Sequence, residues 1–234
     1  MSEHIIQAFD QELDVLKQKV NEIGLGCKSQ LKNCIQALHN QDLELAEKTI
    51  HIDSKINSLQ READALSVEI LARRHPVAKD LRYVVASFRI ATDLERIADY
   101  IAAIAKMIID LEHIWPDEFI HLIAEMAEDA MDMLESAMLS YKTMDTDLAV
   151  SVWHSDDQID KTYKRLLKRL GKCMHKEKKM VRPCTALLFG ARGCERIGDH
   201  ITNVVENVYF IVHGVSYHGK SGKSAGNGEK EGAS

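Results

Sequence analysis

Acidic side chains spaced four residues apart are the residues of this sequence best suited to chemistry. Glu95 and Asp99 form one such pair, and Glu195 and Asp199 form another, one hundred residues later. On a helix, residues i and i+4 share a face, so each pair would present two carboxylates side by side. Like charges at this spacing destabilise an isolated helix slightly. A cation between the carboxylates would offset that repulsion.

A preceding segment in each half of the chain offers further oxygen ligands. Asp156 and Asp160 are four residues apart, and Asp53 and Asn57 take the corresponding positions in the first half. Helices that each present such a pair can enclose a metal ion. Oxygen ligands favour Mg, Ca or Mn, and iron and zinc stay open. The predicted metal ligands are Asp53, Glu95, Asp99, Asp156, Asp160, Glu195, Asp199 and Asn203.

Ion pairing inside a helical bundle is the alternative explanation for these carboxylates. Arg96, Arg192 and Arg196 are near enough in sequence to pair with several of them. A single Glu-x-x-x-Asp on a helix is common, whereas related pairs at equivalent positions of a repeat favour a cation site. The second half is expected to be the better site, because Asn57 replaces an acid in the first half and Ala103 stands opposite Asn203.

Other motifs point to an enzyme only weakly. Glu118 and His121 form one Glu-x-x-His, but a ferritin-like di-iron site needs two. The lysines between Lys172 and Lys179 suit the C-terminal end of a helix, where cations are favoured. The sequence has no glycine-rich phosphate loop, no Gly-x-Ser-x-Gly and no His-Glu-x-x-His. A non-enzymatic role is therefore predicted, with a metal-dependent enzyme on a helical bundle as the alternative.

Long helices must position these side chains. Apolar residues recur with a period near 3.6, strand signals are nearly absent, and Pro76, Pro116 and Pro183 fall in polar breaks. Asp42 and either Asp145 or Asp147 are suitable N-caps. The sequence predicts an all-α fold with helices near residues 5–39, 42–74, 78–112, 117–142, 146–175 and 181–213.

The six helices are two copies of three. Asp42-Leu43-Glu44-Leu45-Ala46 resembles Asp145-Thr146-Asp147-Leu148-Ala149, and Glu95-Arg96-Ile97-Ala98-Asp99 resembles Glu195-Arg196-Ile197-Gly198-Asp199. The repeat predicts two tandem three-helix bundles, at residues 1–113 and 114–213. Residues 214–234 are rich in Gly, Ser and Lys, so a disordered tail is expected there.

Composition limits the compartment and the partners. The net charge is −6, which does not favour nucleic-acid binding. The most apolar stretch, residues 97–111, is too short and too charged to span a membrane. With no apparent secretory signal, a cytoplasmic protein is expected. The five cysteines are odd in number and lack a Cys-x-x-Cys, so free thiols are predicted.

The order, spacing and duplication of these motifs resemble the PhoU family. Phe9-Asp10-Gln11-Glu12-Leu13, the segment from Asp53 to Asn57 and the twin Glu-Arg-Ile-x-Asp segments carry the resemblance, which extends from about residue 4 to residue 213. It implies two similar three-helix bundles, a homodimer, and metal motifs that can bind multinuclear iron or zinc clusters. The motifs fall on Asp53, Glu95 and Asp99, and on Asp156, Asp160, Glu195 and Asp199.

The resemblance also implies a function. PhoU proteins restrain phosphate uptake and repress the phosphate-starvation response in the cytoplasm. The expected partners are the ATPase subunit of the phosphate ABC transporter and its sensor histidine kinase, with membrane association only through those partners. An accessory protein of another phosphate transporter is a further alternative.

Overall fold

Six α-helices make up almost all of the structure. This computed structural model describes residues 2–111, 116–217 and 219, and this part of the chain contains no strand. The all-α prediction is therefore confirmed. The helices are α1 (Ser2–Asn40), α2 (Leu43–Arg74), α3 (Ala78–Asp110), α4 (Asp117–Thr143), α5 (Thr146–Lys176) and α6 (Val181–His213), with a short 3₁₀ turn at Lys178–Met180 before α6.

Short polar residues begin two of the helices as the sequence predicts. Asp42 caps α2, where its Oδ1 accepts a hydrogen bond from the Leu45 amide at 2.9 Å. Asp145 caps α5, where its Oδ1 accepts from the Asp147 and Leu148 amides at 3.0 Å. Pro183 lies within the first turn of α6 and not in the break before it. A proline is tolerated there because first-turn amides have no partner inside the helix.

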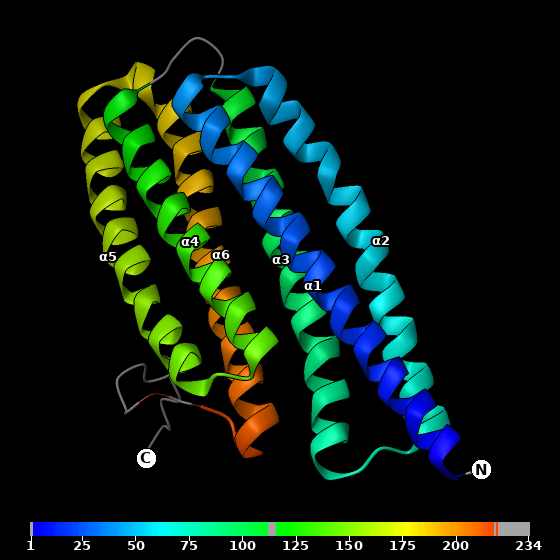
Figure 1. Cartoon of the computed structure of the whole chain (residues 1–234). Helices are drawn as coiled ribbons and strands as arrows, with labels where there is room; N and C mark the ends of the chain where they lie inside the picture. Colours follow the sequence, from blue (N-terminus) through cyan, green and yellow to red (C-terminus); the bar gives the residue numbers. More distant parts are fainter. Residues whose placement is uncertain (1, 112–115, 218, 220–234) are drawn as a thin grey trace, which may run out of the picture.

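The two halves lie side by side (Figure 1). Helices α1, α2 and α3 contact one another, as α4, α5 and α6 do, and this is the tandem architecture that the repeat predicts. Contacts between the halves run from α1 to α4 and, most extensively, from α3 to α6. The four inner helices are thus α1, α3, α4 and α6, while α2 and α5 pack on the outer sides.

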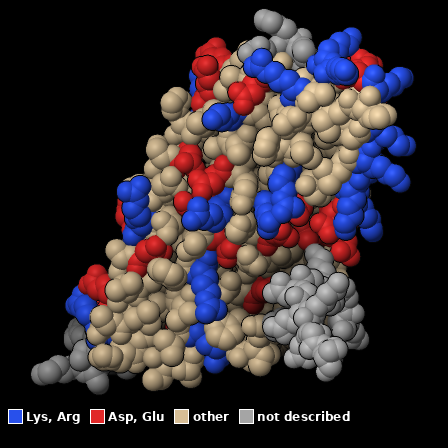
Figure 2. Space-filling model, turned by 180° about the vertical axis from the view of Figure 1, so that it is seen from behind, with Lys and Arg blue, Asp and Glu red and all other residues tan. Residues whose placement is uncertain are grey.

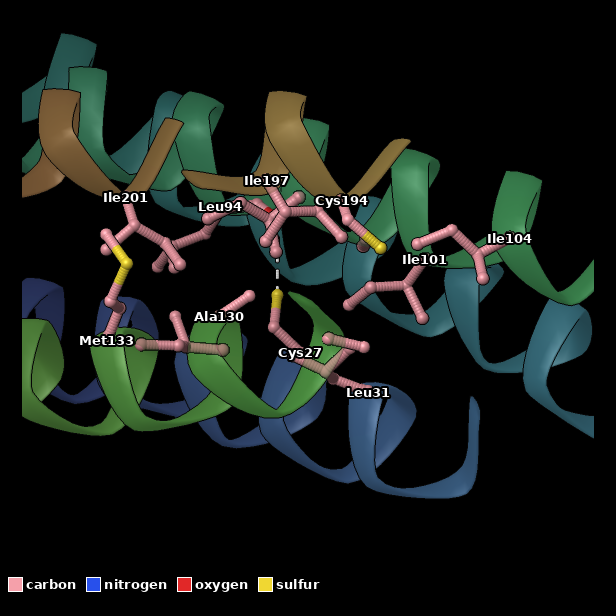
Figure 3. Close-up of a cluster of buried hydrophobic side chains, with 14 of the residues drawn as sticks. Cys27, Leu31, Leu94, Ile101, Ile104, Ala130, Met133, Cys194, Ile197 and Ile201 are labelled. Atoms are coloured by element: carbon pink, nitrogen blue, oxygen red, sulfur yellow. Dashed lines mark hydrogen bonds between the residues drawn. The ribbon is translucent and has the colours of Figure 1, made fainter. Parts of the chain in front are cut away.

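Apolar side chains from all four inner helices meet in one core (Figure 3). Leu31 of α1, Ile101 of α3, Met133 of α4 and Ile197 of α6 are at most 4% exposed. The buried Cys27 thiol donates to the Leu94 carbonyl oxygen at 3.1 Å. All five cysteines have free thiols, as predicted. Burial of this shared apolar surface stabilises the pairing of the two halves.

Repeat-equivalent residues meet where α3 crosses α6. Tyr100 and His200 occupy the same position in the two copies, and their rings stack with centroids 5.7 Å apart. A residue that contacts its own repeat equivalent lies near the axis that relates the two copies. The halves are therefore related by an approximate twofold rotation through the α3–α6 contact.

The residues that directly follow α6 contact α5 and α6. Gly214 ends α6 with a positive φ of 75°. The Tyr217 ring then packs on Trp153 of α5, with centroids 5.4 Å apart, and on Tyr209 of α6. The disorder expected for residues 214–234 stays a prediction. Residues 218 and 220–234 lie outside the described residues, as does the predicted boundary between residues 113 and 114. Across the described helices, none is long and apolar enough to cross a membrane.

Candidate metal centre

Three of the predicted ligands come together in the first half. Asp53 of α2 lies within electrostatic reach of Glu95 and Asp99 of α3, and we call these three residues the first carboxylate cluster. Burial and the charge of Asp99 raise the pKa of Asp53. The same two causes, burial first, raise the pKa of Glu95. Because the charge of Asp99 raises the pKa of both Asp53 and Glu95, the three carboxylates lie within electrostatic reach of one another.

Amide and guanidinium groups already satisfy part of this cluster. Asn57 Nδ2 donates to Asp53 Oδ2 at 3.1 Å. Arg96 Nη1 lies 3.0 Å from Asp99 Oδ2, and its Nε lies 3.5 Å from Glu95 Oε2. Asp53 Oδ1 and Asn57 Oδ1 are nevertheless buried with no hydrogen-bond partner among the described residues. Buried oxygens without partners are costly, and a cation would satisfy them.

The second half repeats the arrangement with one more acid. Asp156 and Asp160 of α5 face Glu195 and Asp199 of α6, and these four form the second carboxylate cluster. Burial, followed by the charge of Asp199, raises the pKa of Glu195, and Asp160 contributes in the same direction. Glu195 Oε2 is buried without a hydrogen bond from the described part of the chain. Asp160, Glu195 and Asp199 thus lie within electrostatic reach of one another.

A glycine lets Asp156 approach α6. Asp156 is 1% exposed, and a Cβ atom built on Gly198 would collide with its Oδ1. The first half has Ala98 at the equivalent position. Sequence reasoning did not assign a role to Gly198, although the Ala98 to Gly198 difference between the repeats was visible. Because Gly198 has no side chain, α5 and α6 can pack more closely at the second carboxylate cluster.

Arginines neutralise the second cluster as they do the first. Arg192 Nη1 lies 2.9 Å from Glu195 Oε1, and Arg196 Nη1 lies 3.2 Å from Asp199 Oδ2. Arg196 thus repeats the position and the pairing of Arg96. The arginine pairing that the sequence left open is present in both halves (Figure 2 shows acidic and basic groups side by side in the middle of this face).

Asn203 does not join the second cluster in this structure. Its Nδ2 donates to Asp93 Oδ1 of α3 at 3.1 Å, and His200 Nδ1 lies 2.9 Å from the same oxygen. The three residues link the two halves. No sequence pattern predicts this link, because it depends on how α3 and α6 pack, although Asp93 stands opposite Gly193 in the repeat.

The oxygen donors suit a cation, but the side chains are not arranged as a complete ligand set. Within the described ranges, no group of three or more His, Cys, Asp or Glu side chains is placed to hold a metal ion. Each cluster has carboxylates from two helices and an arginine that supplies positive charge. Each also has a buried carboxylate oxygen, Asp53 Oδ1 or Glu195 Oε2, to which the described residues donate no hydrogen bond. The donor chemistry therefore fits a cation that displaces Arg96 or Arg196.

The other sequence candidates contribute no site. Glu118 pairs with Arg169 at 2.5 Å, and His121 is exposed. Both lie on α4, away from the carboxylates of α2, α3, α5 and α6. The molecule is thus a duplicated helical bundle with two carboxylate clusters.

The family follows from comparison with known proteins. The PhoU domain model matches residues 20–108 and 123–208, one match for each half. The chain belongs to the PhoU family. The resemblance predicted from the motifs is thereby confirmed, and so is a non-enzymatic role, because relatives across this family are named as accessory proteins.

Relatives match over almost their whole length. A Rhizobium meliloti protein named as a phosphate-specific transport system accessory protein PhoU homolog is 34% identical, and the alignment covers 94% of this chain and 93% of that protein. A Caulobacter vibrioides homolog with the same name is 32% identical, with 92% and 94% covered.

Solved structures of relatives share the fold. The crystal structure of PhoU from Pseudomonas aeruginosa superimposes with a TM-score of 0.86 at 31% identity, and covers 88% of this chain and 100% of that one. The phosphate transport system regulatory protein PhoU from Streptococcus pneumoniae gives a TM-score of 0.83 at 28% identity, with 90% and 99% covered.

Proposed function

We propose that this protein is an accessory protein of a phosphate transport system that represses the phosphate-starvation response and restrains phosphate uptake. The observation that carries the proposal is full-length similarity to proteins named as phosphate-specific transport system accessory proteins. A fold without the catalytic motifs sought supports a role in binding other proteins. The protein would act in the cytoplasm as a homodimer.

The proposed mechanism is that of an adaptor. The protein would bind the ATPase subunit of the phosphate ABC transporter and the sensor histidine kinase, so that the state of the transporter sets the output of the kinase. Two halves related by an approximate twofold rotation offer two similar faces on one rigid core, which suits simultaneous contact with two partners.

Purified partners test the adaptor directly. The full-length chain should co-elute in size-exclusion chromatography with the ATPase subunit, with the cytoplasmic part of the kinase, and with both together. The elution volume of the chain alone reports whether it is a homodimer. Binding of neither purified partner would contradict the adaptor mechanism.

A metal role for the carboxylate clusters is the second part of the proposal. Asp156, Asp160, Glu195 and Asp199 would hold the better site, and Asp53, Glu95 and Asp99 the weaker one. When bound, iron or zinc would supply a fixed positive charge that braces α2 against α3 and α5 against α6. Mg, Mn and Ca are the alternatives that oxygen ligands allow.

Metal content after purification tests this role. The wild-type protein should retain metal after exposure to each ion and gel filtration, and Glu195→Gln/Asp199→Asn should lose most of it. Glu128→Gln/Asp132→Asn is the matched control, because these exposed acids of α4 have the same spacing. Equal metal content in all three proteins would contradict the assignment.

A further inference from the structure

The outward side of the C-terminal half of α5 is strongly basic. Its cationic side chains recur at spacings of three and four residues, which places them on one side of the helix. All of them are exposed, and the row continues through the 3₁₀ turn into α6. This basic face comprises Lys161, Lys164, Arg165, Lys168, Arg169, Lys172, Lys176, Lys178, Lys179 and Arg182.

The charge of this face opposes that of the whole chain. Between residues 161 and 182 the sequence has a single acidic residue, Glu177, while the chain carries a net charge of −6. Figure 2 shows Lys and Arg side chains gathered along the upper right edge, where the α5–α6 turn lies after the rotation from Figure 1. Positive charge is therefore concentrated at one end of the molecule.

Ion pairs account for part of the basic face. Arg165 Nη2 lies 3.0 Å from Glu125 Oε2 on α4, and Arg169 pairs with Glu118 on the same helix. Lys164 and Lys179 pair with acids close to them in sequence. Five lysines of the basic face have no acidic group of the described residues within 4.0 Å. They are Lys161, Lys168, Lys172, Lys176 and Lys178.

Stability of the helix does not explain these lysines. The macrodipole favours cations only in the last turn of a helix. It accounts for Lys176 at the end of α5 but not for Lys161 or Lys168, which lie two or more turns before that end. Like charges along one side repel one another, so the row carries a cost in the free protein.

Exposed apolar side chains lie at the same end of the molecule. Phe189 is 70% exposed and Val181 is 45% exposed, and both belong to the first three turns of α6. Arg182 and Phe189 are seven residues apart and share one side of that helix. Lysines beside exposed aromatic and aliphatic side chains are typical of surfaces that bind at a membrane interface.

We propose that the basic face binds the surface of a membrane rich in anionic phospholipids, with Phe189 and Val181 entering the headgroup region. The inference rests on the proposed function only in that a transporter partner would lie in a bilayer. It departs from the expectation that the protein reaches the membrane solely through its partners.

The chemistry of the unpaired cations favours lipid over an acidic protein surface. All five are lysines, whose flexible, compact charges suit a diffuse layer of phosphate groups. Recognition of defined carboxylates favours the rigid fork of arginine, and the two arginines of α5 are already paired within the molecule. If the face instead bound only an acidic protein, the chain would not sediment with anionic vesicles.

Vesicle sedimentation tests the proposal with the full-length protein. Wild type should sediment with phosphatidylcholine vesicles that contain phosphatidylglycerol and not with vesicles of phosphatidylcholine alone. Binding should weaken as salt is added, because salt screens exposed charges. Lys161→Gln/Lys168→Gln/Lys172→Gln/Lys176→Gln should lower the partition coefficient by about 600-fold, since each of the four lysines near such a surface contributes about five-fold.

A charge-matched control distinguishes the effect of the basic face on binding from the effect of net charge. Lys32→Gln/Lys79→Gln/Lys106→Gln/Lys142→Gln removes four exposed lysines from α1, α3 and α4, and should keep most of the binding. Circular dichroism checks that both variants are folded. Phe189→Ser should lower the partition coefficient by a smaller factor.

Three results would overturn the proposal. They are no sedimentation of wild type with anionic vesicles at low salt, equal losses in the two quadruple variants, and equal binding to neutral vesicles. The assay contains neither the transporter nor the kinase. Its failure would therefore leave the proposed function intact, and failure of the proposed function would leave a positive vesicle result intact.

Discussion

At the scale of single residues, the two halves of the molecule differ most clearly at one small side chain. Gly198 stands where the first half has Ala98, and the absent methyl group leaves room for the buried Asp156 carboxylate against α6. The second cluster therefore depends on a residue that has no functional group of its own.

Gly198→Ala is expected to lower the free energy of unfolding by about 1–3 kcal/mol, the range typical of overpacked sites. The new methyl group would displace Asp156 and press on Ile159 Cδ1, which lies 3.3 Å from the Cβ position. Urea unfolding followed by circular dichroism measures the change.

Gly171→Ala provides the control within α5. In the described structure no atom lies within 4 Å of a Cβ built there, so alanine should raise stability by about 0.5–1 kcal/mol. Equal effects of the two substitutions would mean that Gly198 has no packing role.

A half-buried acid on α4 should make stability depend on pH. Burial, with the charges of Glu125, Asp132 and Glu128, raises the pKa of Asp129, and its Oδ2 has no hydrogen-bond partner among the described residues. Because its pKa is higher in the folded state, the stabilisation from the protonated form is present below the unfolded pKa and is lost as pH rises through the folded pKa.

Asp129→Asn should therefore stabilise the protein at pH 7, with a gain that shrinks as the pH falls to about 4. Thermal unfolding across this range measures the trend. Asp157→Asn, at an exposed position of α5, serves as the control and should show no such trend. A gain that grows toward low pH would contradict the assignment.

At the scale of helices, a buried tyrosine joins the two halves. The Tyr141 hydroxyl of α4 is 2.8 Å from Ser87 Oγ and 3.0 Å from the Tyr83 hydroxyl, both on α3, and Tyr141 is fully buried. Hydroxyl groups from both halves thus form hydrogen bonds with one another inside the core.

Tyr141→Phe should cost about 1–3 kcal/mol of unfolding free energy, because Ser87 and Tyr83 would lose a buried partner. Chemical denaturation measures the loss. Tyr163→Phe on α5, where the ring is half-buried, is the matched control and should cost less. A neutral Tyr141→Phe would show that water replaces the missing hydroxyl.

Helix positions could be predicted largely from sequence, because they depend on local patterns. Asp42 and Asp145 cap α2 and α5 as expected, since capping involves only neighbouring residues. The grouping of Glu95 with Asp99 follows from helix geometry alone. These features need no knowledge of how the helices pack.

Features that depend on packing were outside the reach of the sequence. Asn203 was placed with Glu195 and Asp199, yet it binds Asp93 across the contact between α3 and α6. The contact of the Tyr217 ring with Trp153 likewise joins residues distant in sequence. In both cases the partner is more than fifty residues distant in sequence, and no local sequence pattern predicts the contact.

At the scale of the whole molecule, duplication produces two similar halves held by a shared core. The carboxylate clusters lie between α2 and α3 and between α5 and α6, so each lies within one half, whereas the basic face belongs to the second half alone. The symmetric part suits the proposed adaptor role, and the basic face would distinguish one side of the molecule for the proposed contact with a membrane.

The central claim is that this protein represses the phosphate-starvation response. Phosphatase reporter output in phosphate-rich medium tests it most directly, in the host strain, in a deletion strain, and in the deletion strain carrying wild type or Glu195→Ala/Asp199→Ala. The account predicts that the deletion switches the reporter on and that wild type switches it off, while the double variant restores repression only in part. A deletion strain whose reporter stays silent would contradict the account.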